Sequence, residues 1–146
     1  MIQIKEISAE ETFPIRLEVL RKNIPLPYEF IGDFEVETFH LGAFKNNKLI
    51  AVSSYMKSSC KDLEGSQYQL RGMATLMEFQ GFGAGKLMLE QAFGILKEKK
   101  INILWCNARI AAVDFYKKQG FKTFGKKFTI PFVGEHYVMH KWMNSL

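Results

Sequence analysis

Three glycines occur within seven residues, at a point where a predicted strand gives way to a predicted helix. The stretch QGFGAGK (80–86) lies between the β-rich run SQYQLRGMAT (66–75) and the helical segment LMLEQAFGILKEKK (87–100). Glycine lets a ligand approach the backbone closely, and the unpaired N–H groups at a helix N-terminus favour an anion. This order of elements indicates a phosphate site, although the same residues could form a glycine-rich turn without a ligand.

Two familiar phosphate-binding patterns do not match this stretch. The Walker pattern needs four residues between its first glycine and Gly-Lys-Ser/Thr. Here Gly81 and Gly85 enclose three residues, and Leu87 follows Lys86. In the dinucleotide fingerprint the third glycine would fall on Lys86 or Met88, depending on the starting glycine. The residues alone therefore predict an anion site and do not name its ligand.

Few other side chains have the spacing of a catalytic or metal site. Cys60 and Cys106 are not spaced as metal ligands, so we interpret both as reduced thiols and Cys106 as a small buried hydrophobic residue. His40 and His136 lie in apolar, strand-like segments, where histidine is more often structural than a base, and Glu78 lies in the loop before the glycines. We expect no metal.

Composition limits the classes of protein that this chain can represent. With 146 residues, 47% hydrophobic and 24% charged, it has the content of one globular domain spanning residues 1–146. The apolar runs are too short to span a membrane, and the N-terminus lacks the order of a signal peptide, which predicts a cytoplasmic protein with no membrane partner. The net charge of +5 is not arranged as a basic stripe interleaved with aromatic residues, so we expect no nucleic-acid partner.

The N-terminal segment predicts a strand followed by a helix. IQIKEI (2–7) alternates apolar and polar residues like a half-buried strand, and Ser8 with Glu11 has the form of a capping box. Because proline does not fit a helix interior, Pro14 predicts that the stable helix begins nearer Thr12.

The remaining segments complete a mixed sheet. TFHLGAF and KLIAVSSYM are β-rich runs joined by a hairpin turn at Asn46-Asn47. Later predicted elements are a buried strand INILWCN, a helix AAVDFYKKQ that Gly120 can end, and the final strands FKTFGKKFTI and HYVMHKWM. We therefore predict an α/β (α+β) fold, a mixed and mostly antiparallel sheet of about seven strands with helices on both faces.

Two segments resemble sequence blocks of the GNAT family of N-acetyltransferases. LRGMATLMEFQGFGAGKLMLEQAF (70–93) is similar to the acetyl-CoA-binding motif of that family, with Gln80-x-x-Gly83-x-Gly85 as its core. ILWCNARIAAVDFYKKQGF (103–121) is similar to the next block, in matching order and separation. The runs TFHLGAF, NARIAAVDFY and HYVMHK further resemble a branch of small bacterial predicted acyltransferases similar to ElaA.

The resemblance implies a binding site for acetyl-CoA. The residues whose backbone amides would bind its pyrophosphate, together with the lysine that follows them, are Gln80, Gly81, Phe82, Gly83, Ala84, Gly85 and Lys86. The strand edge at Met73, Ala74 and Thr75 would pair with the pantetheine arm, and the Met73 N–H would face the acyl carbonyl. Ordinary strand pairing is the alternative for this edge, unless a bulge or a separation of strands opens it.

The second block, residues 103–121, contains the residue that would act as the general acid. Tyr116 matches the tyrosine that lies near the CoA sulfur in the family, and its alternative is a core aromatic residue beside Phe115. Seven residues before this tyrosine the family commonly has asparagine, whereas this chain has Arg109, with Asn107 two residues earlier. Arg109 either reaches a CoA phosphate or lies in solvent.

We therefore expect an acyl-CoA-dependent N-acyltransferase that moves the acetyl group of acetyl-CoA directly to a primary amine in a ternary complex. The acceptor would be a small-molecule or peptide amine. The general base is left open among Glu78, His40, His136 and water, and a homodimer is also left open. The alternative from another class is a non-catalytic acyl-CoA-binding or sensing module.

Overall fold

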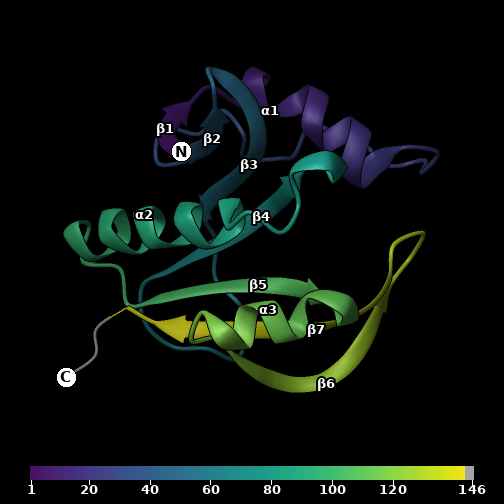
Figure 1. Cartoon of the computed structure of the whole chain (residues 1–146). Helices are drawn as coiled ribbons and strands as arrows, with labels where there is room; N and C mark the ends of the chain where they lie inside the picture. The colour runs from purple at the N-terminus through teal and green to yellow at the C-terminus, as the bar shows by residue number, and fades with distance from the viewer. Residues whose placement is uncertain (144–146) are drawn as a thin grey trace.

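The computed structural model describes residues 1–143, and its strands form one sheet in the order β1-β2-β3-β4-β5-β7-β6 (Figure 1). The strands are β1 (Ile2–Ile7), β2 (Phe39–Lys45), β3 (Lys48–Lys57), β4 (Gln67–Thr75), β5 (Ile103–Arg109), β6 (Lys122–Ile130) and β7 (Gly134–Trp142). The helices are α1 (Ala9–Ile15), the π-helical η1 (Arg16–Arg21), α2 (Ala84–Glu98) and α3 (Val113–Lys118), with 3₁₀ turns η2 (Met77–Phe79) and η3 (Ile110–Ala112). Among the strand pairs of residues 1–143, β4–β5 alone is parallel, so the predicted mixed and mostly antiparallel sheet is confirmed.

β2 and β3 form the predicted hairpin. Asn46 and Asn47 both have positive φ, 50° and 65°, which two-residue hairpins of type I′ require. β2 and β3 pair on either side of this turn, from Lys45 with Lys48 outward. The hairpin prediction is therefore confirmed.

The start of α1 differs from the prediction. Ser8 N donates to Glu11 Oε1 at 2.9 Å and Glu11 N donates to Ser8 Oγ at 3.2 Å, so the capping box is complete and the helix begins at Ala9 rather than near Thr12. The prediction of a later start was wrong because two reciprocal hydrogen bonds stabilise the first turn despite Pro14. Directly after the proline the chain continues as π-helical η1, whose wider turns accommodate the interrupted hydrogen-bond ladder.

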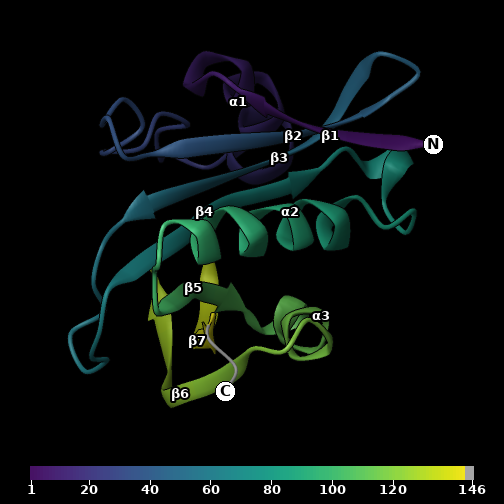
Figure 2. The same cartoon turned by 90° about the vertical axis from the view of Figure 1, so that its left-hand side faces the viewer.

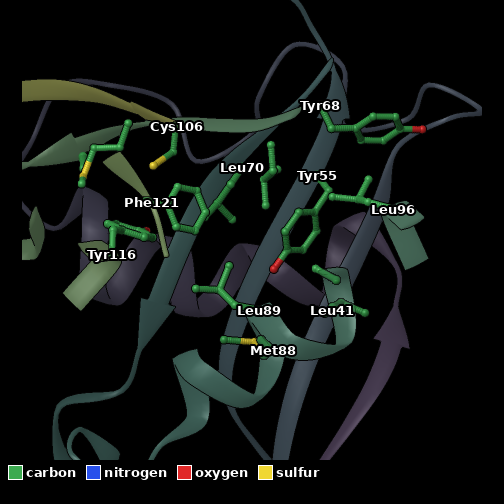
Figure 3. Packing of buried hydrophobic residues seen from close by; sticks show 14 of the residues in the cluster. Leu41, Tyr55, Tyr68, Leu70, Met88, Leu89, Leu96, Cys106, Tyr116 and Phe121 are labelled. Atoms are coloured by element: carbon green, nitrogen blue, oxygen red, sulfur yellow. The ribbon is translucent and has the colours of Figure 1, made fainter. Parts of the chain in front are cut away.

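Helices cover both faces of the sheet, as the sequence predicted. Figure 2 shows α1 above β1–β3 and α2 below them. The larger hydrophobic cluster lies on the side of α2 and α3 and includes Leu70, Leu89 and Tyr116 (Figure 3), whereas the smaller cluster joins Ile15 of α1 to Val52 of β3. No helix within residues 1–143 combines the length and the apolar character that crossing a bilayer requires.

A β-bulge reverses the direction of side chains along β4. The register shifts between Val52 and Ser54 of β3, so that Gly72 and Met73 of β4 together oppose one residue. Gly72 has a φ of +64°, a conformation that glycine adopts without steric cost. In a regular strand Arg71 and Met73 would point to the same face, and the bulge sends them to opposite faces.

The parallel pair β4–β5 separates soon after it forms. The two strands pair from Gln67 with Ile103 to Gln69 with Trp105, after which β4 continues beside β3 and β5 continues beside β7. Figure 1 shows the two strands diverging from a common start. Beyond this point the edges of β4 and β5 that face each other carry backbone groups free for a ligand.

Candidate active site

The glycine stretch forms an open loop at the N-terminus of α2. Gly81 and Gly83 have φ values of +86° and +87°, and a Cβ added at either would meet no atom within 4 Å. Gly83 is the N-cap of α2 and offers no side chain to it, and the first intrahelical bond runs from Leu87 N to Gly83 O at 3.0 Å. The N–H groups before Leu87 therefore have no helical acceptor. Open space and free amides together suit an anion.

The third glycine of the stretch has a packing role. A Cβ at Gly85 would lie 3.1 Å from Phe115 Cζ and 3.7 Å from Met73 Sδ. Glycine at this position thus lets α2 pack closely against α3 and β4. Gln80 Nε2 donates to Thr75 O at 3.2 Å and ties the loop to the end of β4.

A cleft of about 590 Å³ opens where β4 and β5 separate. Its walls come from η1 and the loop after it, and from β4, β5, η3, α3 and the β6–β7 hairpin. Of the residues predicted to bind the cofactor or act in catalysis, Met73, Asn107, Arg109 and Tyr116 line it, as does the candidate base His136. Ala74, Thr75 and the glycine stretch do not line it, although Gly85 lies next to Met73 at its margin.

Tyr116 lies on the face of the sheet that α2 and α3 cover. Its ring is buried and packs against Phe121 at a centroid distance of 5.3 Å (Figure 3). Burial raises the pKa of the Tyr116 phenol well above its usual value, and the nearby Cys106 and Tyr55 raise it further. The phenol is therefore protonated at neutral pH and can donate a hydrogen bond into the cleft, although the raised pKa by itself makes it a weaker proton donor.

Cys106 also lines the cleft, without the properties of a nucleophile. Burial raises the pKa of its thiol far above the ordinary range. Because the thiolate is the nucleophilic form, a neutral buried thiol is unreactive. Its burial agrees with the interpretation of this residue as a small hydrophobic one.

The opposite face of the sheet carries a second set of side chains. Cys106 and Ala108 of β5 belong to the core beside α2 and α3, so the alternation of a strand places Asn107 and Arg109 on the other face. Arg109 pairs directly with His136 of β7, and paired residues project to the same face.

One ring nitrogen of His136 is hydrogen-bonded to the backbone, and the other can act as an acceptor. Its Nδ1 lies 2.7 Å from Gly134 O, and a carbonyl oxygen can only accept, so Nδ1 carries the proton in the neutral ring. Nε2 then bears a lone pair that can take a proton. His136 lines the cleft, whereas Glu78 lies exposed on η2 and does not line it.

The other candidate base is part of a buried network. His40 Nδ1 lies 2.7 Å from Ser54 Oγ, and Nε2 lies 3.0 Å from Asp33 O. Arg16 donates to both oxygens of Asp33, at 2.8 and 2.9 Å, and to Ser54 Oγ at 2.8 Å. With both ring nitrogens engaged inside this network, His40 has a structural role.

Sequence reasoning missed the part of the cleft wall that contains Arg21, Phe30 and Arg71. No single local motif contains all three residues, since they come from η1, the following loop and β4. The available signal was Arg71, a charged residue beside a glycine within an otherwise β-rich run. Among residues 1–143, no group of three or more His, Cys, Asp or Glu side chains is arranged to hold a metal ion.

Comparison with known proteins identifies the family. The model of the Acetyltransferase (GNAT) family matches residues 3–121. The chain belongs to the GNAT family. A Bacillus subtilis protein described as "Uncharacterized N-acetyltransferase YitI" is 37% identical over 147 residues, covering 99% of each chain. The GNAT family resemblance inferred from the sequence is confirmed, and the chain is an N-acetyltransferase.

Solved structures share the GNAT fold of this chain. Escherichia coli ElaA matches with a TM-score of 0.80 at 17% identity, covering 97% of this chain and 99% of that one. FeeM, an N-acyl amino acid synthase from uncultured soil microbes, matches with a TM-score of 0.83 at 10% identity, covering 98% and 91%. Identities this low show the fold alone, so membership of the ElaA-like branch stays a prediction.

Proposed function

We propose that this GNAT protein transfers the acetyl group of acetyl-CoA directly to a primary amine while both substrates are bound. The observation that carries the proposal is the cleft between β4 and β5, which has Tyr116 on one face of the sheet and His136 on the other. A donor bound along one face and an acceptor bound along the other could meet in this opening. The cytoplasmic location expected from the sequence stays a prediction.

The residues at the start of α2 fit a CoA pyrophosphate. Gly81 and Gly83 leave the space before them open, and the N–H groups of the first helical turn have no helical acceptor. The helix dipole adds a favourable field for an anion at the same place. The free edge of β4 at Met73 would accept the pantetheine arm, and the bulge directs the Met73 side chain toward Gly85 on the same face.

Three groups of the chain would perform the chemistry. His136 Nε2 would remove a proton from the acceptor amine, so that its nitrogen can form a C–N bond with the acetyl carbon. The Met73 N–H would donate to the carbonyl oxygen as it gains negative charge. Tyr116 would protonate the sulfur as the C–S bond breaks. Alternatively, a water molecule would remove the proton from the acceptor amine in place of His136.

Calorimetric titration with CoA, together with thermal melting, tests the binding step. Occupancy of a site present in the folded state alone stabilises it, by about 2.7 kcal/mol at a hundredfold excess over Kd. We expect heat of binding and a higher melting temperature. A saturating titration that changes neither would refute the assignment of the glycine loop.

A screen of primary amines with acetyl-CoA, following thiol release, tests the transfer step. Turnover with any amine supports the enzyme and excludes the alternative of a sensing module. Binding of CoA without thiol release across small-molecule and peptide amines would favour that module instead.

A further inference from the structure

Three arginines converge on the acceptor side of the cleft. Arg21 comes from the end of η1, Arg71 from β4 and Arg109 from the end of β5, and all three line the cavity. Arg71 Cζ lies 4.3 Å and Arg21 Cζ lies 5.4 Å from the centroid of the Phe30 ring. These residues are far apart in sequence, so the fold alone assembles the cluster.

The positive charges of neighbouring arginines affect the pKa values of Arg21 and Arg71. The pKa of Arg21 is lowered by burial and then by the positive charges of Arg109 and Arg16. The pKa of Arg71 is lowered by burial and by the charges of Arg16 and Arg21, against an opposing contribution from Asp33. Repulsion among like charges favours any anion that binds between them.

Within residues 1–143 the cluster has no acidic partner in an ion pair. The ion pairs there are Arg16–Asp33, Lys57–Glu37 and Lys127–Glu135. The one acidic residue that lines the cleft, Glu29, takes part in none of them. Arg16 is neutralised by Asp33, whereas Arg21, Arg71 and Arg109 line the cleft without a carboxylate in an ion pair. Arg21 also donates to the backbone carbonyls of Pro27 at 3.0 Å and Leu20 at 3.2 Å, which hold its guanidinium in place.

The fold holds Arg71 in place through the bulge in β4. The Phe30 ring centroid lies 3.9 Å from Arg16 Cζ as well as 4.3 Å from Arg71 Cζ. A Cβ on Gly72 would lie 2.9 Å from Phe30 Cε2 and 3.1 Å from Arg16 Nε, so this position admits the ring only because it is glycine. An arginine held against an aromatic ring presents a planar, preorganised fork for a carboxylate or phosphate.

We propose that the amine acceptor carries an anionic group, a carboxylate or a phosphate, which Arg71 binds together with Arg21 and Arg109 while the amine faces His136. This inference rests on the acetyl transfer proposed above and specifies its acceptor. The arginines share the face of His136, opposite Tyr116, so they are placed for the acceptor rather than for the CoA pyrophosphate at the glycine loop. A cleft of about 590 Å³ suits a small molecule.

The test compares primary amines that differ only in their second functional group. Straight-chain ω-amino acids, the matching ω-amino amides and the matching aminoalkylphosphonates, each of several chain lengths, would be assayed by thiol release with acetyl-CoA. A charge-assisted pair favours the acid over its amide by roughly tenfold to a hundredfold in kcat/KM. The carboxylate and phosphonate series then show which anion is preferred.

Arg71→Met and Arg109→Gln are the diagnostic variants, and Lys118→Met is the control because it removes one exposed charge on α3 outside the cleft. We expect the first two to reduce the ratio of acid to amide turnover, mainly through KM, with CoA affinity and melting temperature retained. The control should keep the wild-type ratio. If Arg71→Met does not fold, the ratio of acid to amide turnover of Arg109→Gln still tests whether the arginines bind the anionic group.

Equal turnover of acids and amides by the wild-type protein would overturn the inference while leaving acetyl transfer intact. If no amine is acetylated, the melting temperature with CoA and each acid provides an independent readout. A further rise with acids and not with amides supports the anion site even where the transfer proposal fails. An equal melting temperature with acids and with amides would overturn the inference of an anion site.

Discussion

Tyr116 is the residue whose environment most directly suggests a chemical role. Its ring is part of the core beside Phe121, whereas its position also lines the cleft where β4 and β5 separate. Core packing and catalysis are therefore compatible at this residue. A variant that lacks the hydroxyl and keeps the ring therefore separates the catalytic role of Tyr116 from its role in core packing.

Tyr116→Phe should retain the fold and the affinity for CoA but slow acetyl transfer, because the group that would protonate the sulfur is lost. A positioned proton donor contributes ~10²–10⁴-fold to the rate. Single-turnover kinetics, with CoA affinity measured in parallel, would check this. A loss of about tenfold would indicate that the phenol orients the sulfur, with water as the donor. An unchanged chemical step would leave Tyr116 as a core aromatic.

Gly83→Val should weaken CoA binding by roughly 10- to 100-fold, since a branched side chain would occupy the open space before the first turn of α2 and remove charge-assisted hydrogen bonds. Gly125→Val is the matched control, because Gly125 also has positive φ, +79°, and no neighbour within 4 Å of an added Cβ, and it lies outside the cleft. Both variants should lose about 1–2 kcal/mol of stability through backbone strain. Equal CoA affinity of the two variants, measured by calorimetry, would show that the glycine loop is not part of the CoA-binding site.

At the scale of elements, α2 combines a functional N-terminus with a helical body that packs on the sheet. Its buried residues include Met88, Leu89, Ala92 and Leu96, which form one apolar face. Gly94 lies on the exposed side, where a Cβ would meet no atom within 4 Å. Glycine is therefore required at the start of α2 and not in its middle.

Gly94→Ala should stabilise the protein by about 0.5–1 kcal/mol, because alanine loses less backbone entropy than glycine when a helix forms. For a chain of this size the melting temperature should rise by roughly 1–4 °C. Urea unfolding and thermal melting would measure the change, with CoA affinity as the control. An unchanged or lower stability would contradict the placement of Gly94 on the exposed face of a regular helix.

At the scale of the whole molecule, one buried polar network joins segments from the N-terminal half of the chain. Arg16, Asp33, His40 and Ser54 belong to η1, the loop that follows, β2 and β3. Arg16 also lies 3.9 Å from the ring of Phe30, whose other neighbours include Arg71 in the cleft. Through Phe30, the network therefore contacts the part of the cleft wall that contains Arg71.

The network predicts acid sensitivity. Burial lowers the pKa of His40, as does the charge of Arg16, whereas Asp33 and Glu6 oppose this shift. A histidine with a lowered pKa binds fewer protons when folded, so the free energy of unfolding should fall as pH decreases below the ordinary value of about 6.5. Asp33 has a lowered pKa as well, but its contribution is lost at more acidic pH.

Urea unfolding between pH 8 and pH 5 would measure this dependence. His40→Gln should be less stable at pH 8 and should show a shallower loss toward pH 5. Burial also lowers the pKa of His140, which would account for the remaining slope and which His140→Gln would remove. An identical slope in wild type and His40→Gln would show that His40 does not titrate with folding.

The sequence by itself determined the elements and the residues that we propose for the donor side of the site. Strand and helix periodicity, the Asn46-Asn47 turn and the glycine stretch before α2 are local features, and each was recognisable because neighbouring residues carry the whole signal. The start of α1 was misplaced because the reciprocal bonds of Ser8 and Glu11 outweighed the local effect of Pro14.

The tertiary structure alone decided which residues form the proposed acceptor side. Arg21, Arg71, Arg109 and His136 are separated by tens of residues, and they meet because β4 and β5 stop pairing after Gln69 and Trp105. A bulge at Gly72 then directs Arg71 away from the face of Met73. Where two strands separate depends on the register and twist of the whole sheet, and no local pattern of residues encodes that position.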